Sequence, residues 1–226
     1  MADGTCHRPF LFMYTFQITV RNEPLAMVRR AVDSIRKNAP TAPLIVVADG
    51  SGRDDVAKLC TSSDADFVAG EHLKLLYKGG RWWHRFATLA IKKDTKYVLK
   101  FDPDSIMWRP IRIEPFSDYF GTLGNFGYIQ GGCQGFSRMF LEKIITSGIL
   151  LDDSKMCDTR NWHADSAYQQ MFQHMGYLST DWTMWYIARE LNVVADMWSE
   201  VNSKWKAVGP NKDLRYAVTH PHKMEE

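Results

Sequence analysis

The sequence of 226 residues is poor in cysteine, and its four cysteines are scattered without a C-x-x-C pair. That pattern excludes a small disulfide-stapled scaffold and a cysteine zinc site, so we expect free thiols in a reducing compartment. No apolar run approaches the roughly 20 residues needed to cross a bilayer, and the first residues lack the basic and apolar regions of a secretory signal. We therefore expect a soluble, cytoplasmic protein with no membrane span.

The sequence also lacks an excess of charge of either sign. Its formal net charge is +2, and basic and acidic residues are interspersed along the chain. Nothing in this balance requires a nucleic acid or an anionic membrane as a partner. With 45% hydrophobic residues, the chain is long enough to bury a full core, and we predict a single domain spanning residues 1–226.

Hydrophobic patterning predicts alternating strands and helices. Apolar runs typical of buried strands alternate with segments of helical spacing: strands at 11–20, 44–48, 66–69 and 96–101, and helices at 25–38, 56–60 and from 78 onward. Because a strand–helix–strand crossover brings its two strands parallel, the order indicates an α/β fold. We expect a mainly parallel sheet flanked by helices.

An acidic pair follows the strand at 96–101. Pro103 cannot donate a ladder hydrogen bond, so the strand should stop there, with Asp102 and Asp104 at its carboxyl end. If the segment is extended, both carboxylates point to the same side. Two carboxylates this close repel each other unless a cation lies between them, and Mn²⁺ or Mg²⁺ prefers such oxygen ligands. The alternative is a solvated turn with two surface acids.

Seven short segments, in this order and spacing, resemble the GT-A glycosyltransferases, which transfer a sugar from a nucleotide-sugar donor. They are Thr19-Val20-Arg21-Asn22, Ala48-Asp49-Gly50-Ser51, Gly79-Gly80-Arg81, Asp102-Pro103-Asp104, the glycine-rich 131–138, His163-Ala164-Asp165 and Thr219-His220-Pro221-His222-Lys223. The resemblance runs from about residue 12 to residue 223. It implies a GT-A fold with a mixed, mainly parallel central sheet. The nucleotide-binding half would be about 10–105 and the acceptor-binding half about 106–226.

The resemblance implies donor contacts at the ends of the first two strands. The backbone of Thr19, Val20 and Arg21 would flank the nucleotide base, and Asp49 would accept a hydrogen bond from the base or ribose. An Asp-Gly sequence is also a common turn signal, which is the alternative for Asp49.

Two glycine segments are further candidates for donor binding. Gly79 and Gly80 open a helix whose amino terminus favours anions, so Arg81 or Arg85 is expected to touch the diphosphate or sugar, unless these arginines only face solvent. By the resemblance, Gly131 and Gly132 would pass under the donor sugar. We expect residues 131–135 to be irregular because of their glycines, with a helix at about 137–146, and residues 182–188 and 193–194 to add strands or a further layer.

The catalytic and remaining metal residues come from the resemblance alone. Asp165 would be the general base of an inverting enzyme, His220 would complete the metal site with Asp102 and Asp104, and Lys223 would neutralise a phosphate. The implied enzyme is a metal-dependent hexosyl- or pentosyltransferase that moves a sugar, with inversion, from a UDP-sugar to a glycan or other hydroxyl acceptor. A retaining outcome stays open if Asp165 only binds a sugar hydroxyl.

Three other readings of the acidic pair stay open. A haloacid dehalogenase-type phosphatase also places Asp-x-Asp after a strand, but near the start of the chain. A nucleotidyltransferase uses a related sheet and metal, but normally has a glycine- and basic-rich loop after its first strand, where this chain has Arg21-Asn22-Glu23-Pro24. A binding module without catalysis is the third.

Overall fold

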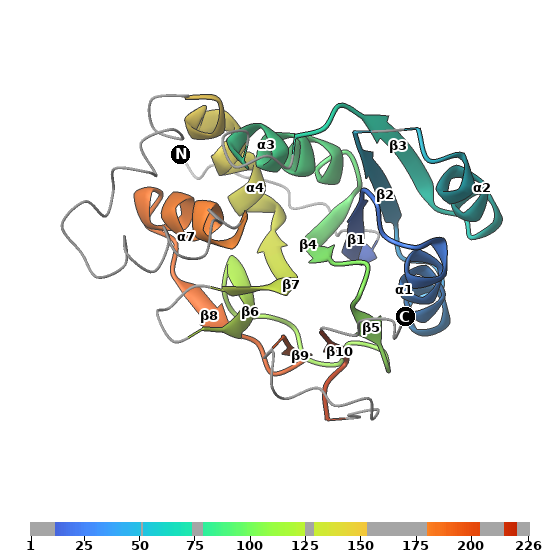
Figure 1. Cartoon of the computed structure of the whole chain (residues 1–226). Helices are drawn as coiled ribbons and strands as arrows, with labels where there is room; N and C mark the ends of the chain where they lie inside the picture. The colour runs from blue at the N-terminus through green and yellow to red at the C-terminus, as the bar shows by residue number, and fades with distance from the viewer. Residues whose placement is uncertain are drawn as a thin grey trace, which may run out of the picture.

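The computed structural model describes residues 12–50, 52–73, 79–124, 129–152, 180–203 and 215–220. Its central element is a seven-stranded sheet in the order β3-β2-β1-β4-β7-β6-β8 (Figure 1). The strands are β1 (Phe12–Val20), β2 (Leu44–Asp49), β3 (Asp66–Gly70), β4 (Thr95–Phe101), β6 (Tyr119–Leu123), β7 (Ile129–Ser137) and β8 (Ala195–Met197).

The sheet is mixed and mainly parallel. Strands β3, β2, β1 and β4 are parallel neighbours, whereas β7 is antiparallel to both β4 and β6, and β8 is parallel to β6. The fold class predicted from the sequence is confirmed. Because β1, β2 and β4 run in the same direction, Val20, Asp49 and Phe101 end at the same edge of the sheet.

Helices cover both faces of this sheet (Figure 1). They are α1 (Leu25–Asn38), α2 (Asp54–Ser62), α3 (Gly79–Ala90), α4 (Arg138–Ser147) and α7 (Thr180–Glu190), with a 3-10 turn η1 (Ile149–Leu151). One core cluster joins α1 and α2 to the sheet, and a second joins α3, α4 and α7 to the opposite face. Strand β4 contributes to both, since Tyr97, Leu99 and Phe101 belong to the first cluster and Val98 to the second.

A small second sheet lies beside the carboxyl end of β4 (Figure 1). It contains β5 (Ile106–Met107), β9 (Val201–Asn202) and β10 (Val218–Thr219), with β10 in the middle. Arg109 Nη1 lies 2.7 Å from Glu200 Oε2, and the backbone N–H groups of Ala217 and Val218 donate to the Glu200 carbonyl at 2.8 and 3.0 Å. These contacts fix β10, which immediately precedes His220.

One prediction of local structure in the second half of the chain is wrong. Residues 131–135 are not irregular, because they lie inside β7. Gly135 is compatible with a strand there because the Phe120 ring packs over it, and a Cβ at position 135 would lie 1.9 Å from Phe120 Cε2. Residues 182–188, which we expect to add strands or a further layer, lie within α7, a helix of the layer that covers one face of the sheet. The helix predicted at 137–146 is confirmed as α4, where Ser137 Oγ accepts the Phe140 N–H at 3.1 Å as an N-cap.

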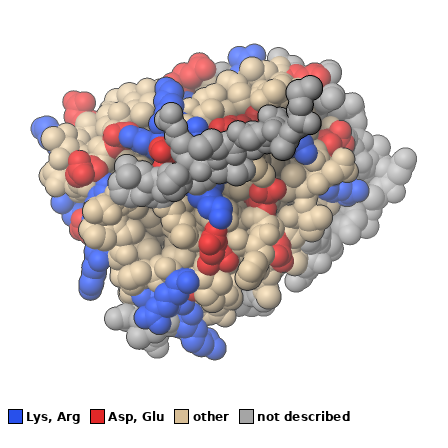
Figure 2. Space-filling view, turned by 180° about the vertical axis from the view of Figure 1, so that it is seen from behind, with Lys and Arg blue, Asp and Glu red and all other residues tan. Residues whose placement is uncertain are grey.

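Charges of both signs are mixed on the face of the molecule that Figure 2 shows. Figure 2, which views the molecule from behind, shows Lys and Arg interspersed with Asp and Glu. Cys60 and Cys133 are free, as predicted for these two thiols, and both are buried. Within the described ranges, no helix has the length and apolar character needed to span a membrane.

Candidate functional site

The acidic pair lies on a turn that leaves the sheet directly after β4. Ser105 N–H donates to the Asp102 carbonyl at 2.9 Å, and Pro103 and Asp104 occupy the two central positions. The prediction that β4 stops before Pro103 is confirmed. The expectation of an extended segment is wrong, because a turn of four residues, in which proline favours the second position, brings the two carboxylates together.

The turn is held against β7 through one carbonyl. Gly132 O accepts from Asp102 N at 2.9 Å and from Ser105 Oγ at 2.8 Å. Both Asp102 and Ser105 are therefore fixed to the strand that runs beside β4.

Asp102, Asp104 and His220 meet at this turn. One ligand atom from each lies within 4.8 Å of the others. His220 Nε2 is 3.0 Å from Asp104 Oδ1 and 3.9 Å from Asp102 Oδ2. Asp104 is only 7% exposed, so its charge is partly shielded from water. The tertiary structure thus joins two residues at the end of β4 with one that follows in sequence more than a hundred positions later.

His220 is positioned by the small sheet and by Gly132. Its backbone N–H donates to the Asn202 carbonyl at 3.0 Å, and the neighbouring Thr219 Oγ1 accepts from Trp108 Nε1 at 2.7 Å. The imidazole lies over Gly132, where a Cβ would come within 2.0 Å of His220 Cγ. Only glycine leaves room for the ring at this position.

These three side chains fit a hard divalent cation. Two carboxylate oxygens and one imidazole nitrogen are acceptable ligands for Mn²⁺ or Mg²⁺, and a spread of 4.8 Å is close to twice a metal–ligand distance of about 2.1 Å. His220 Nδ1 is buried with no hydrogen-bond partner among the described residues. His220 Nε2 faces the two carboxylates, at 3.0 Å from Asp104 Oδ1, so it is the nitrogen that would share a cation with them.

Lys100 is a part of this site that the sequence analysis missed. Its Nζ lies 2.5 Å from Asp102 Oδ1 and 2.5 Å from the Gly131 carbonyl, and its side chain is 6% exposed. The signal in the sequence was a lysine two residues before the acidic pair, between the apolar residues Leu99 and Phe101.

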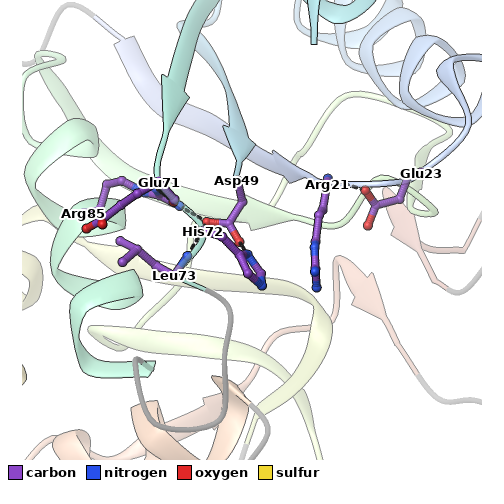
Figure 3. Close-up of polar contacts among 7 residues, drawn as sticks. All are labelled: Arg21, Glu23, Asp49, Glu71, His72, Leu73 and Arg85. Atoms are coloured by element: carbon purple, nitrogen blue, oxygen red, sulfur yellow. Dashed lines mark hydrogen bonds and ion pairs between the residues drawn. The ribbon is translucent and has the colours of Figure 1, made fainter. Parts of the chain in front are cut away.

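Asp49 is enclosed by its own protein partners. Its carboxylate accepts from Leu73 N–H at 3.0 Å, contacts His72 Nδ1 at 2.8 Å and pairs with Arg85, which also donates to the Glu71 carbonyl at 2.8 Å. Figure 3 shows these groups converging on Asp49. The Asp49 side chain is 0% exposed, so direct contact with a base or ribose would require one of these partners to move.

The other donor-side candidates lie at the same edge or on α3. Thr19 and Val20 end β1, and the exposed Arg21 follows, its N–H donating to Glu23 Oε2 at 2.5 Å (Figure 3). Gly79 and Gly80 begin α3 as predicted. Arg81 and Arg85 both line a hollow of about 680 Å³, together with Gly70, Glu71, Leu73, His84, Thr88 and Leu151.

Two predicted site residues, Asp165 and Lys223, lie outside the described residues. Their roles stay predictions from the sequence. Gly131 and Gly132 are described. The Gly131 carbonyl accepts from Lys100, and the Gly132 carbonyl accepts from Asp102 N and Ser105 Oγ.

The sequence matches no protein-family model and no curated protein. Among solved structures, the chain is similar to the glycosyltransferase GlyE of Streptococcus pneumoniae TIGR4, with a TM-score of 0.54 and 8% identity over 84% of this chain and 46% of that one. It also aligns with the mannosyltransferase PcManGT of Pyrobaculum calidifontis, solved with GDP-Man and Mn²⁺, with a TM-score of 0.43 and 15% identity over 61% of this chain and 50% of that one.

The fold is therefore of the GT-A glycosyltransferase type. The likeness to GlyE extends over most of this chain at an identity too low to show more than the fold. The chain spans about half the length of either solved protein.

Proposed function

We propose that this protein is a metal-dependent glycosyltransferase that moves a hexosyl or pentosyl group from a nucleoside-diphosphate sugar to an acceptor hydroxyl. The observation that carries the proposal is the convergence of Asp102, Asp104 and His220. This cluster lies where parallel sheets bind ligands, at the carboxyl end of β4 in a GT-A fold. UDP is the expected nucleotide, from the family resemblance.

In this proposal the cluster holds Mn²⁺ or Mg²⁺ next to the donor diphosphate. When bound, the cation would supply Lewis-acid stabilisation of the negative charge on the leaving diphosphate. Asp102 and Asp104 contribute the two negative charges that attract it, and His220 contributes a neutral nitrogen ligand.

The remaining residues are assigned to the donor and the acceptor. The backbone of Thr19, Val20 and Arg21 would flank the base. Asp49 would bind base or ribose after one of its protein partners moves, and Arg85, like Arg81, would touch the diphosphate or sugar. The donor sugar and phosphates would lie near the residues predicted for them, namely Gly79, Gly80, Arg81, Pro103, Gly131, Gly132 and Lys223.

The reaction we propose inverts the anomeric centre. Asp165 would take the proton of the acceptor hydroxyl as that oxygen attacks opposite the leaving diphosphate, a contribution of about 10²- to 10⁴-fold for a general base. The acceptor would be a glycan or another molecule with a free hydroxyl.

The position of the acidic pair argues against a phosphatase of the haloacid dehalogenase type. In such a phosphatase the nucleophilic acid follows a strand near the start of the chain. In this protein Asp102 follows β4, which comes after three parallel strands and their helices. A nucleotidyltransferase shares the sheet and the metal requirement, so product analysis must separate it from a glycosyltransferase.

The test is incubation with Mn²⁺ and a panel of UDP- and GDP-sugars, with chromatography of the products. Release of nucleoside diphosphate is the expected result, and EDTA should abolish it. Asp104→Asn should also abolish it, whereas Asp33→Asn, an exposed acid on α1, should have no effect. In a second incubation with added pyrophosphate, formation of nucleoside triphosphate and sugar 1-phosphate from the donor would identify a nucleotidyltransferase. Free inorganic phosphate would identify a phosphatase, and binding without turnover a binding module.

A further inference from the structure

Lys100 is an unusual residue for the interior of a buried strand. It lies in β4 between Leu99 and Phe101, both 0% exposed, and its own side chain is 6% exposed. Burying an ammonium group costs free energy unless it is paired and hydrogen-bonded. Here the partners are Asp102 Oδ1 and the carbonyl of Gly131, each at 2.5 Å.

The contact changes the charge that a cation would meet. Asp102 and Asp104 contribute −2 and Lys100 contributes +1, which leaves −1 with a neutral His220. A divalent cation would therefore turn the cluster to a local charge of +1. An uncompensated charge in a partly buried site is unfavourable, and a nucleoside diphosphate supplies the missing negative charge.

We propose that Lys100 is a built-in counter-charge of the acidic pair, which makes cation binding at Asp102, Asp104 and His220 depend on a bound nucleoside diphosphate. This inference rests on the proposed function, since it assigns a further residue to the same site. By thermodynamic linkage, the diphosphate must strengthen cation binding by the same factor as the cation strengthens diphosphate binding.

A purely structural role for Lys100 would have a different signature. If the lysine only held Asp102 in place through its hydrogen bond, removing it would loosen a ligand and weaken binding of the cation. Removing a counter-charge strengthens cation binding and weakens diphosphate binding. The two roles therefore differ in the sign of the change in cation affinity.

The experiment uses Lys100→Met and Lys100→Gln, which remove the charge, and calorimetric titration with Mn²⁺ alone. The glutamine keeps a hydrogen-bond donor for Gly131. Both variants should bind Mn²⁺ more tightly than the wild type by about tenfold or more, and after saturation with Mn²⁺ both should bind UDP and GDP more weakly.

The matched control is Lys96→Met. Lys96 lies in the same strand, but its side chain is 47% exposed and pairs with Glu114. This variant removes the same charge from the protein at the surface, so its affinity for Mn²⁺ should equal that of the wild type. Equal or weaker Mn²⁺ binding by the two Lys100 variants would overturn the proposal.

Two further measurements separate this proposal from the proposed function. Wild-type protein that binds no Mn²⁺, or an Asp104→Asn variant that binds it normally, would contradict the metal site itself. If both Lys100 variants fail to fold, the wild type still gives an answer. The affinity of the wild type for Mn²⁺ should be about tenfold or more higher in the presence of UDP than in its absence, after correction for Mn²⁺–UDP complexes in solution. Equal affinities in the two conditions would overturn the proposed counter-charge role of Lys100.

Discussion

The imidazole of His220 packs so closely on Gly132 that a Cβ at position 132 would lie 2.0 Å from its Cγ. Gly132 also accepts hydrogen bonds from Asp102 and Ser105 through its carbonyl. One residue of β7 therefore holds the acidic turn on one side and leaves space for the histidine on the other.

Gly132→Ala should displace His220 and weaken Mn²⁺ binding by about 10- to 100-fold, the range seen when a group that orients a metal ligand is lost. Calorimetric titration would measure it. Gly52→Ala is the matched control, because a Cβ at position 52 would meet nothing within 4 Å. Unchanged Mn²⁺ affinity in Gly132→Ala would mean that His220 is not a ligand.

Trp108→Phe should weaken Mn²⁺ binding by about tenfold while lowering the free energy of unfolding by only about 1 kcal/mol. The variant keeps an aromatic ring but loses the donor to Thr219 Oγ1, next to His220. Titration with Mn²⁺ and urea denaturation would measure the two effects. A loss of stability without a loss of Mn²⁺ affinity would contradict the positioning role.

Asp165→Asn should keep donor binding and lose transfer by about 10²- to 10⁴-fold, as expected for removal of a general base. UDP-sugar affinity and acceptor-dependent product formation are the two measurements. Turnover at the wild-type rate would remove Asp165 from catalysis. Weaker donor binding with transfer otherwise intact would instead favour a sugar-binding role, which leaves a retaining reaction open.

Asp49→Asn should lower the free energy of unfolding by about 3 kcal/mol, because it leaves the Arg85 charge without its partner in a largely buried network. Urea denaturation would measure it, with Asp33→Asn as the exposed control. A loss below about 0.5 kcal/mol, the usual effect of a surface substitution, would show that the network contributes little to folding.

The thiols of Cys60 and Cys133 should resist alkylation at pH 8. Burial raises the pKa of Cys60 to about 11 and that of Cys133 to about 12, so almost no reactive thiolate is present. Since these values lie above the ordinary 9.0, the stabilising contribution of the protonated thiols is complete below pH 9 and is lost as the pH rises toward 12. Peptide mapping after iodoacetamide treatment would check this, with urea-unfolded protein as the reactive control.

Much of the fold could be predicted because its signals are local. The strands β1 to β4 and the helices α1 to α4 are found where apolar periodicity and proline predicted them, and the end of β4 before Pro103 follows from the missing N–H of proline. The glycine run of β7 led to the wrong prediction of an irregular segment, because these glycines are required by side chains that are distant in the sequence. Gly135 faces the ring of Phe120, and Gly132 faces His220.

The sequence by itself determined that an acidic pair ends a buried strand of an α/β sheet, since proline, alternation and apolar runs act over a few residues. Only the tertiary structure decided what surrounds that pair. His220 arrives through the small sheet, Lys100 turns its charge toward Asp102, and Arg85 and His72 enclose Asp49. Apart from Lys100, which lies two residues before Asp102, the residues in these contacts come together only when separate strands and helices pack against one another.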